Sequence, residues 1–99
     1  MHVSREEPGV TVLRCYGELS LAELATIAAA AARARAARRV VVLDLSRVSH
    51  LHYAGARLLR DVHGLRLAGA SRYLRDLLLA GGGFGVEFHP DVACAVRAG

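Results

Sequence analysis

The run from Val40 to Leu45 (VVVLDL) constrains the fold more than any other part of this sequence. It is almost wholly apolar, rich in β-branched residues, and bracketed by Arg39 and Ser46. A short apolar run without alternation is typical of a strand inside a sheet that other elements cover. We therefore expect a buried central strand here, with helices packed on the sheet.

Two segments upstream of this run also have the character of strands. In Val10 to Tyr16, alternate residues would point to opposite faces of a strand, and the segment is rich in β-branched residues. We expect Gly17 to end this strand. His2 to Arg5 is predicted as a short edge strand. A tight turn at Glu7-Pro8-Gly9 should join the two strands into a hairpin, because Pro and Gly supply the backbone angles that such a turn needs.

Helix signals separate the predicted strands. Ser20 and Glu23 have the spacing of a capping box, which predicts a helix from Leu21 to Ala37. Its predicted apolar stripe consists of Leu21, Leu24, Ile27, Ala28 and Ala31. After a loop from Ser49 to Tyr53, we expect a short second helix from Ala54 to His63, with Gly64 as its C-cap.

The last third of the chain repeats this alternation in shorter elements. The predicted segments are a weaker strand at Leu65 to Ala68, a helix at Arg72 to Ala80 capped by Ser71, a helix stop and turn at Gly81 to Gly85 (GGGFG), and a short strand at Val86 to Phe88. The order predicts one α/β domain over residues 1–99. It should have a mixed, mostly parallel sheet of four to five strands and about three helices.

The composition narrows the class of protein. Of the 99 residues, 54% are hydrophobic and 22% charged, which is unlike a disordered chain. All thirteen cations are Arg, and they give a net charge of +4. They are spread along the chain except for a cluster over 33–39 at a predicted helix end, so we expect a solvated face and no nucleic-acid partner.

The cysteines, the N-terminus and the lengths of the apolar runs indicate a cytoplasmic location. Cys15 and Cys94 lack the spacing of zinc ligands, and the N-terminus is polar, with Arg5 and Glu6 where a signal peptide is apolar. No apolar run approaches the ~20 residues of a membrane span. We expect a reduced, cytoplasmic protein with no direct membrane insertion, no metal and no cofactor.

Three segments, taken together and in order, resemble one family. They are Val10 to Ser20 (VTVLRCYGELS), Val40 to Ser46 (VVVLDLS) and His50 to Leu59 (HLHYAGARLL). Their most specific parts are Gly17-Glu18-Leu19, Leu43-Asp44-Leu45-Ser46 and Ala54-Gly55. On these residues the chain resembles a STAS domain, the fold of bacterial anti-sigma factor antagonists, over roughly residues 3 to 85.

The resemblance implies a non-enzymatic protein that docks on an anti-sigma factor of the kinase type. In such antagonists a kinase ends the docking by phosphorylating a Ser at the start of the second helix, which adds about −1.5 to −2 charges to the docking face. This chain departs from the pattern at that place. Ser20 stands where the family usually has Asp, and His52-Tyr53 stand where it usually has Asp-Ser. With Tyr53 at the phosphoacceptor position, we expect the Ser phosphorylation switch to be lost.

The resemblance places the partner-binding site on the loop before the second helix and on the start of that helix. The predicted partner-binding residues are Ser20, Ser49, His50, His52, Tyr53, Ala54, Gly55 and Arg57. Tyr53 is either an anchor at the centre of the face or a half-buried ring lying over the adjacent helix. His50 and His52 are either loop histidines, a metal pair without a nearby third ligand, or groups that titrate at the interface. The resemblance makes Asp44 structural, and no nucleophile and base pair indicates an enzyme.

Three other functions stay open. The first is that of a STAS subunit that binds the ATPase of a lipid-transport ABC system. The second is that of a homo-oligomer, or of a component that assembles with related STAS domains into a signalling complex. A basic nucleic-acid module is the third, although the chain lacks the aromatic platforms and clustered cations that such a module needs.

Overall fold

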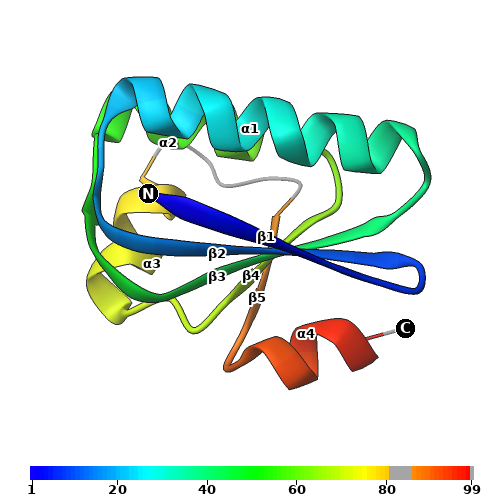
Figure 1. Cartoon of the computed structure of the whole chain (residues 1–99). Helices are drawn as coiled ribbons and strands as arrows, with labels where there is room; N and C mark the ends of the chain where they lie inside the picture. The colour runs from blue at the N-terminus through cyan, green and yellow to red at the C-terminus, as the bar shows by residue number, and fades with distance from the viewer. Residues whose placement is uncertain (81–85, 99) are drawn as a thin grey trace.

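The computed structural model describes residues 1–80 and 86–98 (Figure 1). In chain order it contains β1 (His2–Glu7), β2 (Val10–Leu19), α1 (Leu21–Ala36), β3 (Val40–Leu51), α2 (Tyr53–Arg60), β4 (Leu65–Ala68), α3 (Arg72–Leu79), β5 (Val86–His89) and α4 (Val92–Arg97). One five-stranded sheet has the order β1-β2-β3-β4-β5. β1 is antiparallel to β2, and the other neighbouring strands are parallel. The predicted α/β fold with a mixed, mostly parallel sheet is confirmed.

The apolar run that opens β3 forms the centre of the molecule. Val41 to Leu45 is buried, and its side chains alternate between the two faces of the sheet. Val41, Leu43 and Leu45 pack in the main core with residues of α1, α2 and α3. Val42 packs on the other face against Ala95 of α4. Figure 1 shows α1 and α4 on opposite sides of the sheet.

The helix α4 was missed from the sequence, which predicted about three helices where the described residues contain four. It has only six residues, too few for a helical period to emerge. Its start is marked by Asp91, whose Oδ1 accepts a hydrogen bond from the Cys94 backbone at 2.8 Å. Cys94 therefore lies in a helix.

The predicted hairpin is confirmed, with β1 reaching Glu7 and a turn at Pro8-Gly9 in which Gly9 has a φ of +74°. Arg39, which follows α1, ties this hairpin to the rest of the fold. Its guanidinium donates to the Glu7 carbonyl at 2.5 Å, to the Val10 carbonyl at 2.6 Å and to the Thr11 hydroxyl at 2.8 Å. This member of the Arg cluster has a structural role.

The predicted end of β2 at Gly17 is wrong, because the strand continues to Leu19. Gly17 has a φ of +73°, and the register against β3 shifts on both sides of it, so it is a bulge within the strand. The predicted loop from Ser49 to Tyr53 is also wrong. Ser49 and His50 belong to β3, and only one residue separates β3 from α2.

The second helix is shorter than predicted, since it ends at Arg60 with Asp61 as its C-cap. Gly64, predicted as the C-cap, lies in the following turn, where its φ of +76° favours glycine. The predicted stop and turn at Gly81 to Gly85 lie outside the described residues. In the part of the chain that the structure describes, no helix has the length and apolarity needed to cross a membrane.

Candidate functional site

The candidate site lies at the end of the sheet where β2, β3 and β4 are followed by the three helices that cover one face. The first turn of each helix is fixed by a side chain that accepts a backbone hydrogen bond. Ser20 Oγ accepts from Glu23, His52 Nδ1 from Ala54, and Ser71 Oγ from Leu74, each at 3.2 Å. The three helices therefore begin at well-defined places along one edge.

Ser20 is a cap in the structure, and the predicted capping box with Glu23 is confirmed. The Glu23 carboxylate also accepts a hydrogen bond from the N-terminal ammonium group of Met1. This hydrogen bond, together with the backbone bond from Ser20, lowers the pKa of Glu23 from its ordinary value. The start of α1 and the N-terminus of the chain are thus held together.

Tyr53 is the first residue of α2, and its side chain is 75% exposed. Its ring stacks on His52, with the ring centroids 5.3 Å apart and an angle of 13° between the planes. The interpretation of Tyr53 as a half-buried ring over the adjacent helix is therefore wrong. The ring stands in solvent, supported by a neighbour that also caps the helix.

His50 makes a similar pair with Tyr73 of α3, a residue that sequence reasoning missed. The Tyr73 hydroxyl lies 2.5 Å from His50 Nδ1, and the two rings stack at 5.7 Å. His50 and His52 line one hollow of about 240 Å³ together with Ser20, Glu18 and Leu19. Among the described residues, no group of three His, Cys, Asp or Glu side chains is placed to hold a metal ion.

The other predicted site residues divide into exposed and buried ones. Ser49, Ala54 and Arg57 are exposed near the start of α2. Gly55 is buried, and a Cβ built on it lies 3.1 Å from the Cβ of Leu24 in α1. Its role in the fold is therefore to let α2 approach α1 closely.

Three large apolar side chains are exposed in the first turns of the three helices. They are Leu21 at 46%, Tyr53 at 75% and Tyr73 at 51%. The prediction that Leu21 belongs to the buried stripe of α1 is wrong, whereas Leu24, Ile27 and Ala31 of that stripe are buried. We call the surface formed by Glu18, Ser20, Leu21, His50, His52, Tyr53 and Tyr73 the helix-start face.

Asp44 and Cys15 carry groups that can act in catalysis, a carboxylate and a thiol, but their surroundings in this structure do not suit that role. Asp44 is 9% exposed, and its Oδ1 accepts hydrogen bonds from the backbone and hydroxyl of Ser46 at 3.0 and 2.7 Å. Arg14 lies 3.6 Å from its other oxygen. Burial raises the pKa of Cys15 to about 12, so its thiol is not a nucleophile near neutral pH.

Comparison with known proteins agrees with this architecture. A family model for the STAS domain matches residues 3–82. No curated protein sequence matches the chain. The structure of the anti-sigma factor antagonist SpoIIAA in its unphosphorylated form is similar, with a TM-score of 0.66 and 18% identity over 94% of this chain and 91% of that one.

Two further solved structures share the fold. The Bacillus cell fate determinant SpoIIAA in its phosphorylated form has a TM-score of 0.63 and 18% identity over 98% of both chains. An uncharacterized protein from Shewanella loihica with a SpoIIAA-like fold has a TM-score of 0.59 and 14% identity over 97% of this chain and 90% of that one. At these identities the likeness establishes the fold.

Proposed function

The chain belongs to the STAS domain family, and on that premise we propose that it is a non-enzymatic, cytoplasmic docking protein resembling an anti-sigma factor antagonist. It binds an anti-sigma factor of the kinase type through the helix-start face. The observation that carries this proposal is the exposure of Leu21, Tyr53 and Tyr73 in the first turns of three neighbouring helices. Large apolar side chains gathered on one surface mark interaction sites in soluble proteins.

The two tyrosines are suited to be anchors of such an interface. Aromatic side chains dominate binding energy at interfaces because they bury a large area with few rotatable bonds. Each ring is already held against a histidine, Tyr53 on His52 and Tyr73 on His50. Little conformational freedom remains to be lost when a partner covers them.

We also propose that this face lacks the usual Ser phosphorylation switch. The Bacillus protein SpoIIAA occurs in a phosphorylated form, whereas α2 of this chain opens with Tyr53. A phenol hydroxyl projects several ångströms beyond a Ser hydroxyl, so it does not occupy the same place in a Ser kinase. Peptide mapping by tandem mass spectrometry of the protein from its native host should show no phosphate on this face. Phosphate on the exposed Ser49 would instead mean that the switch has moved.

The proposal is tested by capture of partners from the native host with wild type, Tyr53→Ala and Leu79→Ala in parallel. Leu79 is the matched control because it is 47% exposed but lies at the far end of α3. We expect wild type and Leu79→Ala to retain an anti-sigma factor kinase that Tyr53→Ala loses. A truncated anchor of this kind typically costs about 2 kcal/mol or more of binding free energy, or roughly a 30-fold loss of affinity.

Two results would change the proposal in different ways. Retention of the ATPase of an ABC system, with the same loss in Tyr53→Ala, would keep the docking face and replace the partner. Retention of the same partner by all three proteins would contradict the assignment of the face.

A further inference from the structure

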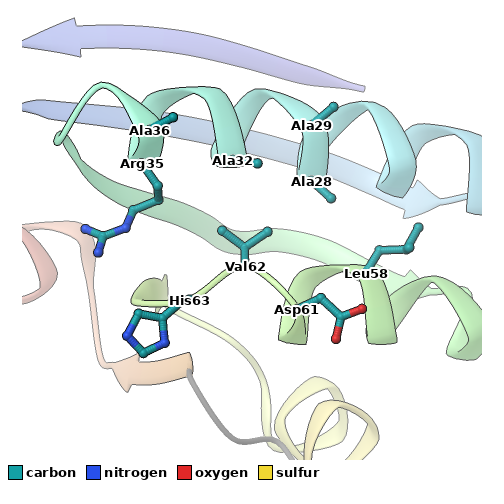
Figure 2. Close-up of a pocket in the computed structure, with 9 residues that line it drawn as sticks. All are labelled: Ala28, Ala29, Ala32, Arg35, Ala36, Leu58, Asp61, Val62 and His63. Carbon is teal, nitrogen blue, oxygen red and sulfur yellow. The ribbon is translucent and has the colours of Figure 1, made fainter.

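A groove of about 560 Å³ lies between α1 and the end of α2, away from the helix-start face (Figure 2). Its α1 wall is made of Ala28, Ala29, Ala32 and Ala36, and the facing wall contains Leu58 and Val62. The groove exists because α1 has 16 residues and α2 only 8. At 1.5 Å per residue these lengths are about 24 and 12 Å, so α2 leaves half of α1 uncovered.

The two ends of the groove carry opposite charges. Figure 2 shows Arg35 of α1 at one end and Asp61, just after α2, toward the other. Neither residue takes part in an ion pair among the described residues. The Arg35 guanidinium lies over Gly64, where a Cβ would come within 2.8 Å of Nη2. Arg35 Nη1 also donates a hydrogen bond to the Arg39 carbonyl at 3.4 Å. The guanidinium is therefore held at the end of the groove, and no carboxylate of the described residues pairs with it.

We propose that this groove is the contact surface between two copies of the chain in a symmetric dimer. In a two-fold dimer the same patch is used twice, so the patch must be complementary to itself. A two-fold axis through the middle of the groove exchanges its ends and brings Arg35 of each copy toward Asp61 of the second copy. The alanine wall lets the two α1 helices approach closely, because small side chains allow close contact between helices.

The pattern of charge favours a second copy over a partner of a different sequence. An unrelated partner would need an acid and a base placed to match both ends, whereas a second copy of this chain carries both, Arg35 toward one end and Asp61 toward the other. The proposal does not depend on the proposed function, because the groove lies along the C-terminal half of α1 and the helix-start face at its N-terminus.

Sedimentation velocity from low micromolar to near-millimolar concentration tests the dimer. We expect wild type to pass from the monomer mass of 10.5 kDa to twice that value. Ala32→Arg, which places a long cation in the middle of the groove, should remain a monomer throughout. Ala93→Arg is the matched control, since Ala93 is an exposed alanine on α4, on the opposite side of the sheet. It should dimerise like wild type.

A charge exchange tests the pairing of Arg35 with Asp61. Arg35→Asp and Asp61→Arg should each raise the dissociation constant of the dimer at least about tenfold, because like charges then face each other. The double variant should restore it to within a few-fold of wild type. Thermal melts of each variant establish that it is folded.

Three outcomes would overturn the proposal. They are a wild type that stays monomeric at every concentration, a dimer that survives Ala32→Arg, and a double charge variant that dimerises no better than the single ones. Capture of a partner by wild type and its loss in Tyr53→Ala would be unaffected by any of these outcomes, so the two proposals fail separately.

Discussion

Replacing Gly55 by Ala should destabilise the protein, although the same change on an exposed helix is stabilising. Gly55 is buried in the first turn of α2, and a Cβ built there lies 3.1 Å from Leu24 Cβ and 3.3 Å from Leu24 Cγ. Leu24 is fully buried in the core. Because its Cβ is fixed by the backbone of α1, it cannot give way unless α1 and α2 separate.

The size of the effect follows from two opposing terms. Ala is favoured over Gly inside a helix by about 1 kcal/mol. Forcing an extra methyl into a packed core costs about 1–3 kcal/mol, and the 3.1 Å contact with a backbone-fixed atom favours the upper part of that range. We expect a net loss of about 1–2 kcal/mol in the free energy of unfolding, with a fall in Tm of about 4–8 °C for each kcal/mol.

Thermal and urea unfolding followed by circular dichroism measure this change. The control is Ala54→Gly, the reverse substitution at the exposed neighbouring position, which should lose about 0.5–1 kcal/mol through helix propensity alone. A Gly55→Ala protein as stable as wild type, or more stable, would refute the close approach of α2 to α1. If that protein lost only its partner, Gly55 would be a contact residue and not a packing residue.

Four further predictions concern stability and reactivity. Arg39→Ala should lower the free energy of unfolding by about 2 kcal/mol, because it leaves carbonyls of the hairpin without donors; a urea midpoint equal to that of Arg38→Ala, its exposed neighbour, would contradict this. Since burial raises the pKa of Cys15 to about 12, a thiol reagent should label only Cys94 in the native protein at about pH 8, and equal labelling rates would contradict the burial. Stability should also fall as the pH rises above the ordinary thiol value of 9.0 toward about 12. A hydrogen bond from the N-terminal ammonium group lowers the pKa of Glu23 from its ordinary value of 4.5. The ionised Glu23 should therefore stabilise the folded protein fully above pH 4.5, and this stabilisation should be lost as the pH falls through the lowered pKa. Melting temperatures across the acid range should show this loss in wild type and not in Glu23→Gln, and identical pH profiles would count against it.

The parts of the fold that the sequence predicted are those fixed by local signals. Ser20 and Ser71 cap helices because their hydroxyls need only a backbone N–H three residues on. The apolar run at Val40 to Leu45 becomes a central strand because a strand inside a covered sheet buries the side chains on both of its faces. Gly17 failed as a stop signal, since a positive φ serves a bulge inside a strand as well as a turn after one.

The site was less predictable because its contacts join distant segments. His50 and Tyr73 are separated by 23 residues, and only the parallel order of β3 and β4 brings them together. Leu21 has the spacing of the buried stripe, but it lies in the first turn of α1, where the helix begins at the edge of the sheet. Spacing along a helix predicts the direction in which a side chain points. It does not predict whether the sheet extends far enough to cover that side chain.

The helix-start face is formed before any partner binds, and this bears on how docking is controlled. His52 caps α2 and supports the Tyr53 ring, while His50 holds the Tyr73 ring. Fixing a mobile side chain at an interface costs about 0.5–1.5 kcal/mol of binding free energy. Because the Tyr53 and Tyr73 rings are already ordered in the folded protein, much of this cost is met on folding and does not weaken binding. Phosphorylation of a Ser on such a face releases a partner by adding charge. On the proposed function, a face that presents Tyr53 instead has no such local release, so occupancy follows the concentrations of the two proteins and the state of the partner.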